Sequence, residues 1–159
     1  MKKILSVLLA AIMILSAANI AVFAVDTDET KTTSATQVFA DGSYIVVKLH
    51  ESDETNATKA TKTKTGSKDY ELHSSDGELQ WVVTVNGTFT YTGSSATCTK
   101  ATVATKVYKT AWKIISATAS KSSNKATANF TVKRYTLGIV TKTVTDSITL
   151  TCSAKGVLS

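Results

Sequence analysis

The sequence predicts an all-β fold, an antiparallel β-sandwich with about six to seven strands. Threonine accounts for 28 of the 159 residues, and β-branched side chains favour extended strands. The chain has no proline and 43% hydrophobic residues, which excludes collagen-like and proline-rich stalks and chains too polar to fold. Short segments alternate apolar with polar residues between Gly, Ser and Asn turns, as strands with one buried face do.

The first 24 residues have the layout of a secretory signal peptide. A basic start precedes the apolar run 4–22, and the Val-Phe-Ala sequence at 22–24, which ends this run, predicts cleavage after Ala24. The alternative is an uncleaved anchor, because this run is long enough to span a bilayer. Cleavage would leave a secreted chain from Val25 with no further membrane span, extracellular or associated with the cell envelope.

The remaining chain predicts one domain. Residues 25–36 are acidic and rich in Thr and Ser, which is typical of a flexible leader. Residues 37–159 are expected to form a single β-sandwich. Within it, residues 51–78 contain few apolar side chains and predict a polar excursion, with room for an edge strand protected by lysines.

Alternation and turn residues define the first strands. An Asp-Gly step at 41–42 predicts a hairpin between segments 37–40 and 43–50. From 79 to 91 the large side chains fall on odd positions. This favours one continuous strand, bent at Gly87, over a hairpin at that glycine that would split the apolar set between two faces.

The later strands follow in the same way. In segment 96–108 the inward set changes parity, which predicts a β-bulge near Lys100. A strand beginning at Trp112 should end at the polar turn 121–124, and the next strand should end at Leu137-Gly138. The last strand has an apolar even-numbered face that ends at Cys152.

Cys98 and Cys152 are the two cysteines of the chain. In an exported protein an even pair favours a disulfide, which would stabilise the fold by about 4 kcal/mol. The alternative is two buried free thiols. Neither cysteine has a partner at metal-ligand spacing, and only His50 and His73 could supply imidazoles, so we expect no metal and no other cofactor.

Two resemblances bear on the fold. Cys98, Trp112 and Cys152 resemble the Cys–Trp–Cys frame of immunoglobulin domains, and segment 146–152 is similar to that family's Asp-x-x-x-Tyr-x-Cys, with Leu150 in place of the tyrosine. The first resemblance implies an immunoglobulin-like sandwich. The export signal, the Trp-x-Val and Gly-Thr-Phe-Thr-Tyr sequences and the Leu-Thr-Cys ending also resemble small, uncharacterised secreted proteins of Gram-positive bacteria. The second resemblance implies a secreted β-domain and no known activity.

Charge is segregated along the chain. Residues 25–78 contain 6 lysines and 11 acids, whereas residues 79–159 contain 9 lysines, Arg134 and the single acid Asp146. Either these two parts attract one another, or the basic part binds an anionic cell-wall polymer or glycan. The candidate ligand-binding residues are the cations that adjoin tyrosines, namely Lys106, Tyr108, Lys109, Lys133, Arg134 and Tyr135. No recognisable module supports nucleic-acid binding.

We expect no enzyme activity. A Ser–His–Asp set would need His50 or His73, which lie outside the best-patterned region, and the chain has no Gly-x-Ser-x-Gly elbow. The acids before Leu79 lie in polar sequence that would not raise a carboxyl pKa. We therefore expect a non-catalytic secreted protein that acts at the cell envelope by adhesion or by binding a polyanion or glycan. The alternatives are a small secreted hydrolase and a partner of another protein that pairs through a strand edge.

Overall fold

A computed structural model of the chain describes residues 37–52 and 61–159. These residues form eight strands in two antiparallel sheets and no helix. The predicted antiparallel β-sandwich is therefore confirmed, with eight described strands instead of six to seven. The predicted signal peptide, 1–24, and the predicted leader, 25–36, lie outside the described residues.

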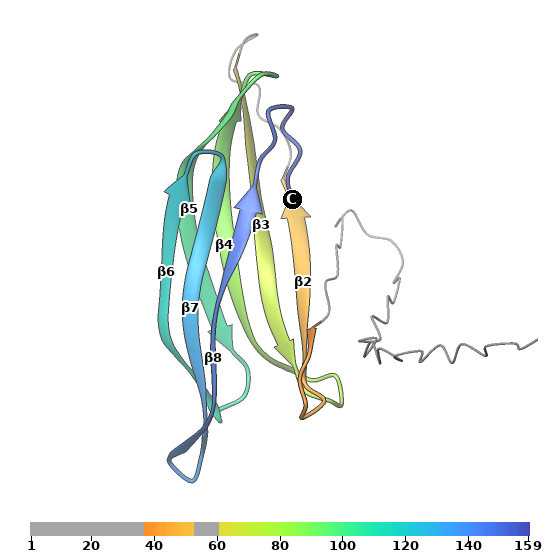
Figure 1. Cartoon of the computed structure of the whole chain (residues 1–159), viewed down its shortest axis with the longest axis vertical. Coiled ribbons are helices and arrows are strands. Elements are labelled where there is room, and N and C mark those ends of the chain that lie inside the picture. The colour runs from red at the N-terminus through yellow and green to blue at the C-terminus, as the bar shows by residue number, and fades with distance from the viewer. Residues whose placement is uncertain (1–36, 53–60) are drawn as a thin grey trace, which may run out of the picture.

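Each sheet is a meander in which neighbouring strands follow one another in the sequence (Figure 1). This order differs from the Greek-key order of immunoglobulin domains. Strands β5 and β6 lie side by side where the chain passes from one sheet to the other. The five-stranded sheet contains β1 (Gln37–Val38), β2 (Tyr44–Glu51), β3 (Lys62–His73), β4 (Leu79–Tyr91) and β5 (Ala96–Val107), and the three-stranded sheet contains β6 (Trp112–Ser122), β7 (Lys125–Thr136) and β8 (Ile139–Thr151).

The core lies between the sheets because alternate residues of the long strands point inward. Strand β4 is continuous through Gly87 and buries its odd-numbered side chains, as predicted. Strand β7 buries its even-numbered side chains from Ala126 to Val132. At the centre, the Trp81 ring makes edge contacts with Trp112 of β6 and Phe130 of β7, with ring centroids 6.1 and 5.8 Å apart. The buried residues of β4 and β7 are Trp81, Val83, Val85, Phe89, Tyr91, Ala126, Ala128, Phe130 and Val132.

The predicted irregularities of the first sheet are confirmed. The β4–β5 register shifts between Thr88 and Phe89, which pair with Lys100 and Cys98, so the β-bulge lies next to Lys100. At the other edge, β1 pairs with the start of β2 through the turn that contains Gly42. The φ angle of Gly42 is +75°, a conformation that glycine adopts without strain.

The predicted polar excursion at 51–78 is wrong for the part that forms β3. This strand is central in its sheet and pairs with both β2 and β4. Its apolar residues, Tyr70 and Leu72, lie at one end of the strand. Nearer the middle of the strand, Gly66 also occupies an inward position, and the Leu158 side chain of the C-terminal segment packs against it. The core is therefore completed there by a distant part of the chain, and β3 needs few apolar residues of its own.

The predicted disulfide between Cys98 and Cys152 is also wrong, because both residues are buried free thiols that do not lie near one another. The Cys98 N–H donates to the carbonyl of Ser123 at 2.7 Å, and the Cys152 N–H donates to that of Asn124 at 3.0 Å. The β6–β7 turn thus lies between the two cysteine backbones. A disulfide needs Cα atoms within about 7 Å of one another, and the turn between the cysteines keeps them apart.

Candidate functional site

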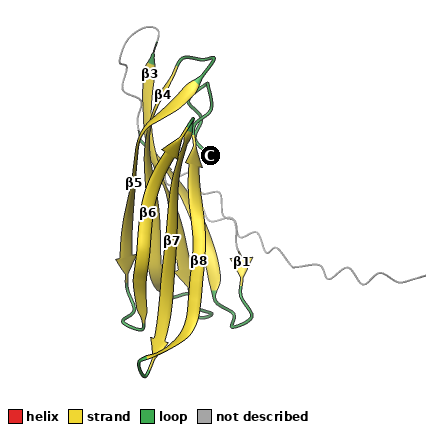
Figure 2. Ribbon diagram, turned by 60° about the vertical axis from the view of Figure 1, so that its left-hand side comes forward, coloured by secondary structure: helices red, strands yellow, loops and turns green. Residues whose placement is uncertain are grey.

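The predicted binding residues come together at one end of the sandwich. Because the strands are antiparallel, the β5–β6 loop and the β7–β8 turn lie at the same end (Figures 1 and 2). The Tyr135 N–H of β7 donates to the carbonyl of Ala111 in the β5–β6 loop at 2.7 Å, which holds the two segments together.

Strand alternation divides these residues between two faces of that end. Val107 pairs with the buried Trp81, so the neighbouring Lys106 points out from the five-stranded sheet. Val132 is fully buried, so the neighbouring Lys133 points out from the three-stranded sheet. Arg134 is exposed near the end of β7. The structure therefore brings the predicted residues to one end but does not bring them into one site.

The first group, at the five-stranded sheet, is largely occupied by its own neighbours. The Lys106 ammonium lies 4.7 Å from the centroid of the Tyr108 ring, close enough for a cation–π contact. The Lys109 Nζ lies 2.8 Å from Glu78 Oε2. This ion pair supports, for Lys109, the expectation that the acidic and basic parts of the chain attract one another.

The second group, on the three-stranded sheet, carries cations without acidic partners. Lys133 of β7 lies directly opposite Lys113 of β6, and the Lys113 Nζ lies 5.2 Å from the centroid of the Tyr135 ring. Within the described residues no acid forms an ion pair with Lys113, Lys133 or Arg134. Like charges that lie directly opposite one another destabilise a sheet.

Lys142 differs from these cations because an acid holds it. It lies opposite Arg134, but its Nζ is 2.8 Å from Asp41 Oδ2 and 3.0 Å from Ser43 Oγ, and it lies over the Phe39 ring. The hydrogen bond from Lys142 holds the pKa of the Asp41 carboxyl well below its usual range. Lys142 thus links β8 to the β1–β2 turn, and its charge is neutralised.

A hydroxyl-rich strip continues from the lysine pair along the outer face of the three-stranded sheet. Threonine hydroxyls meet across β7 and β8, with Thr131 and Thr145 Oγ1 atoms 3.2 Å apart and those of Thr127 and Thr149 2.9 Å apart. The face is hollowed by a shallow depression of about 330 Å³. Its lining residues are Ser116, Thr118, Asn129, Phe130, Thr131, Thr145, Asp146 and Ser147.

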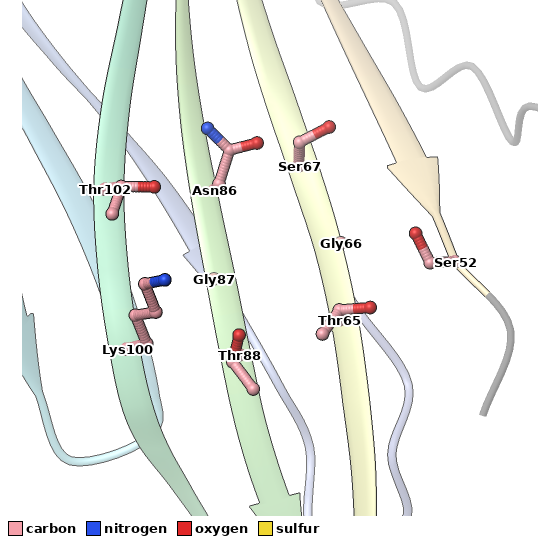
Figure 3. A pocket seen from close by; sticks show the side chains of 9 residues that line it. All are labelled: Ser52, Thr65, Gly66, Ser67, Asn86, Gly87, Thr88, Lys100 and Thr102. Atoms are coloured by element: carbon pink, nitrogen blue, oxygen red, sulfur yellow. The ribbon is translucent and has the colours of Figure 1, made fainter. Parts of the chain in front are cut away.

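A second shallow depression, of about 220 Å³, lies on the five-stranded sheet over the paired Gly66 and Gly87 (Figure 3). Ser67, Asn86 and Thr102 stand around it on three neighbouring strands, and Lys100 supplies a positive charge. This depression has hydrogen-bonding groups for a polar ligand, but Lys100 is the one cation among its lining residues, and none of them is aromatic. It is the weaker candidate for an anionic ligand.

His50 takes part in a hydrogen-bonded row that superficially resembles a hydrolytic triad. Its Nε2 lies 2.9 Å from Asp69 Oδ2, and the Thr84 hydroxyl donates to Asp69 Oδ1 at 2.6 Å. In a triad the histidine lies between the carboxylate and the hydroxyl and removes the hydroxyl proton. Here the carboxylate lies between them, so in this geometry the threonine is bonded to the carboxylate and not to the histidine.

His73 is held by structural contacts. Its Nδ1 lies 3.1 Å from the Gly77 carbonyl and its Nε2 lies 2.8 Å from Glu71 Oε2, while the ring stacks on Tyr44. The buried Glu71 also binds the Lys48 ammonium at 3.0 Å. Among residues 37–52 and 61–159, no three His, Cys, Asp or Glu side chains gather in a way that could hold a metal ion.

Lys113 and the hydroxyl strip are the parts of this surface that the sequence-based prediction missed. Lys113 follows the inward Trp112, so strand parity alone could have placed it on the outer face. Its position opposite Lys133 depends on the β6–β7 register, which shifts between Ile114 and Ser116. The alternation of apolar and polar residues, which gives the face of Lys113, does not mark that shift.

Fold and surface together define an all-β sandwich with a cationic patch and two hydroxyl-rich faces. None of the described residues belongs to a helix long and apolar enough to cross a membrane. Comparisons of the chain with protein-family models, with curated proteins and with solved structures give no match.

Proposed function

We propose that this protein is a secreted, non-catalytic β-sandwich that acts at the cell envelope by binding an anionic polymer or acidic glycan. The binding face is the outer surface of the three-stranded sheet. One observation carries the proposal: Lys113 and Lys133 lie directly opposite one another on β6 and β7, without an acidic partner in the described chain.

An anionic group that binds between these two lysines would relieve their mutual repulsion. A phosphate or carboxylate has several acceptor oxygens and can bind both ammonium groups at once. The Tyr135 ring, which Lys113 overlies, lies on the same outer face and offers an apolar surface beside the charge. Arg134 adds a further exposed cation near the end of β7.

The shape of the polar strip favours a polymer over a single small anion. Beyond Lys133 the outer face continues through Thr143, its partner on β8, to the Thr131–Thr145 and Thr127–Thr149 pairs. These hydroxyls both donate and accept hydrogen bonds, as sugar hydroxyls do. An extended chain could therefore place an anionic group at the lysines and its neighbouring units along the threonines.

Retention on purified cell walls and on a glycan array, at low and at high salt, tests the proposal. Replacing both lysines in K113Q/K133Q should weaken retention at low salt about tenfold. The matched control is K125Q/K155Q, which removes the same charge from two exposed lysines at the opposite end of the sandwich and should retain most of the binding. Equal losses in the two variants would indicate that only net charge matters and would contradict a defined site.

The same experiment separates the two alternative functions. Binding to a polyanion weakens steeply as salt screens the charges, whereas backbone pairing at a strand edge does not. A hydrolase that depends on an imidazole would lose its activity in H50A or H73A. Neither substitution should change retention on an anionic polymer, because both residues lie on the five-stranded sheet.

A further inference from the structure

The β7–β8 turn exposes apolar side chains at the end of the sandwich that carries the lysine pair. Leu137 is 98% exposed, Ile139 69% and Val140 42%. We call residues 136–141 the β7–β8 tip. The tip reaches beyond the neighbouring turns at this end of the molecule (Figures 1 and 2). Single exposed apolar residues are ordinary on protein surfaces, but three within four positions of a projecting turn are not.

The backbone of the tip makes its leucine still less expected. Thr136 pairs with Ile139, so Leu137 and Gly138 are the two central turn residues, and their φ angles are +51° and +81°. Such a turn strongly favours Asn or Gly at its first position. Leucine there is sterically strained and also exposes an apolar side chain to water. A residue that is unfavourable for both reasons indicates a role outside folding.

Hydrogen bonds close the base of the tip, where the β7–β8 register is irregular. The β7–β8 register shifts between Arg134 and Tyr135. At this shift the Thr141 hydroxyl lies 3.4 Å from the Arg134 carbonyl, to which it donates, and 3.4 Å from the Thr136 hydroxyl. These contacts hold β7 and β8 together directly behind the exposed apolar side chains.

The charges behind the tip are positive. Arg134 and Lys133 lie on β7, which leads into the tip, and Lys113 lies opposite Lys133 on β6. No acid forms an ion pair with these cations within the described residues. On the five-stranded sheet at the same end, Asp41 is bound to Lys142 and Glu78 to Lys109. An apolar point with cations behind it is complementary to a surface with negative headgroups above an apolar interior.

We propose that the β7–β8 tip inserts into the surface of an anionic lipid bilayer. Leu137, Ile139 and Val140 would lie among the upper acyl chains, and Arg134, Lys133 and Lys113 would lie at the headgroup phosphates. This interaction goes beyond the proposed polymer binding, because its essential residues are apolar. A bilayer accepts a convex apolar point at any position, whereas a protein partner would need a matching hollow.

Co-sedimentation with lipid vesicles tests the insertion. The chain from Val25, which contains every described strand, is mixed with phosphatidylcholine vesicles that contain roughly 30% phosphatidylglycerol and with vesicles of phosphatidylcholine alone. Wild type should bind the anionic vesicles and should bind the neutral ones much more weakly. The substitution L137N should weaken binding to the anionic vesicles about tenfold.

Two controls separate insertion from damage to the fold. Because asparagine is favoured at this turn position, L137N should unfold at the same or a higher denaturant concentration than wild type. The matched control, V157N, replaces an apolar residue that is 53% exposed near the opposite end and should bind like wild type. In L137W, tryptophan emission should shift to shorter wavelength on anionic vesicles and should be quenched by brominated acyl chains.

Three results would overturn the insertion. The first is equal vesicle binding by L137N and wild type, and the second is equal binding of wild type to anionic and neutral vesicles. The third is a wild-type protein that binds no vesicles but forms a dimer, which the L137N substitution dissociates. Polymer retention is measured on the same variants and should be unchanged in L137N. If wild type binds anionic vesicles but is not retained on the polymer, the proposed function alone is refuted. If wild type is retained on the polymer but does not bind vesicles, only the insertion is refuted.

Discussion

The Tyr70 hydroxyl on β3 donates a hydrogen bond of 2.7 Å to Asp146 Oδ2 on β8 and thereby joins the two sheets. Asp146 is the single acid of residues 79–159, and this bond places it at the open side of the sandwich, opposite the β5–β6 side. Burial, together with the hydrogen bond to Asp146, raises the pKa of Tyr70 well above its ordinary value. The single acid of the basic part of the chain therefore has a structural role.

Removing the hydroxyl in Y70F should lower the free energy of unfolding by about 1–2 kcal/mol, because the hydrogen bond to Asp146 is lost while the ring packing is kept. Denaturant unfolding measures the change. Y108F is the control, since Tyr108 is 46% exposed, and it should be neutral. Equal stability of Y70F and wild type would show that the bond between the sheets contributes nothing.

The two thiols should be unreactive in the folded protein and reactive in the unfolded protein. Both cysteines are buried, and burial raises the pKa of each thiol, which disfavours the reactive thiolate. Mass spectrometry after treatment with iodoacetamide should find no alkylation under native conditions and two alkylated cysteines in denaturant without reductant. A reductant should leave the unfolding midpoint unchanged. Failure to alkylate the unfolded, unreduced chain would instead indicate a disulfide.

Gly87 is required because its missing side chain leaves room for the Phe89 ring. A Cβ at this position would lie 2.5 Å from the ring and 3.2 Å from the Ala126 Cβ, and Phe89 is fully buried. G87A should therefore destabilise the protein by about 1–3 kcal/mol through overpacking. Thermal unfolding measures the loss. F89L should cost less in the G87A background than in wild type, and strictly additive effects would contradict the steric explanation.

Local features of the chain were predictable from sequence. The odd-numbered apolar positions of 79–91 identify the inward face of β4 because a strand alternates its side chains. The parity change near Lys100 identifies the bulge for the same reason. The Asp-Gly and Leu-Gly steps mark hairpins because their glycines adopt positive φ angles. Each of these features depends on residues that are close in sequence.

Features that depend on distant contacts were not predictable. Strand β3 has few apolar residues because Leu158, far along the chain, packs at Gly66. The cysteines occupy inward positions as expected, but the β6–β7 turn lies between them. The predicted binding residues are neighbours in sequence, whereas Lys113 and Lys133 meet only through the β6–β7 pairing. Alternation gives the face of a residue but not its cross-strand neighbour.

The Asp41–Lys142 ion pair should make stability depend on pH in the acid range. Because Lys142 lowers the pKa of Asp41 in the folded protein, the pair stabilises above the ordinary aspartate pKa, and its contribution is lost as pH falls toward the folded pKa. At pH 7, D41N should lower the free energy of unfolding by less than about 1 kcal/mol, since the Asp41 side chain is about half exposed and solvent screens the pair.

The difference between D41N and wild type should shrink as the pH approaches about 2, because the wild-type carboxylate is then increasingly protonated. Urea unfolding at a series of pH values measures this convergence. K142M removes the same ion pair from the other side, so the double variant D41N/K142M should be less destabilised than the sum of the two single changes. A difference that persists unchanged through the acid range would show that Asp41 acts through its turn geometry and not through its charge.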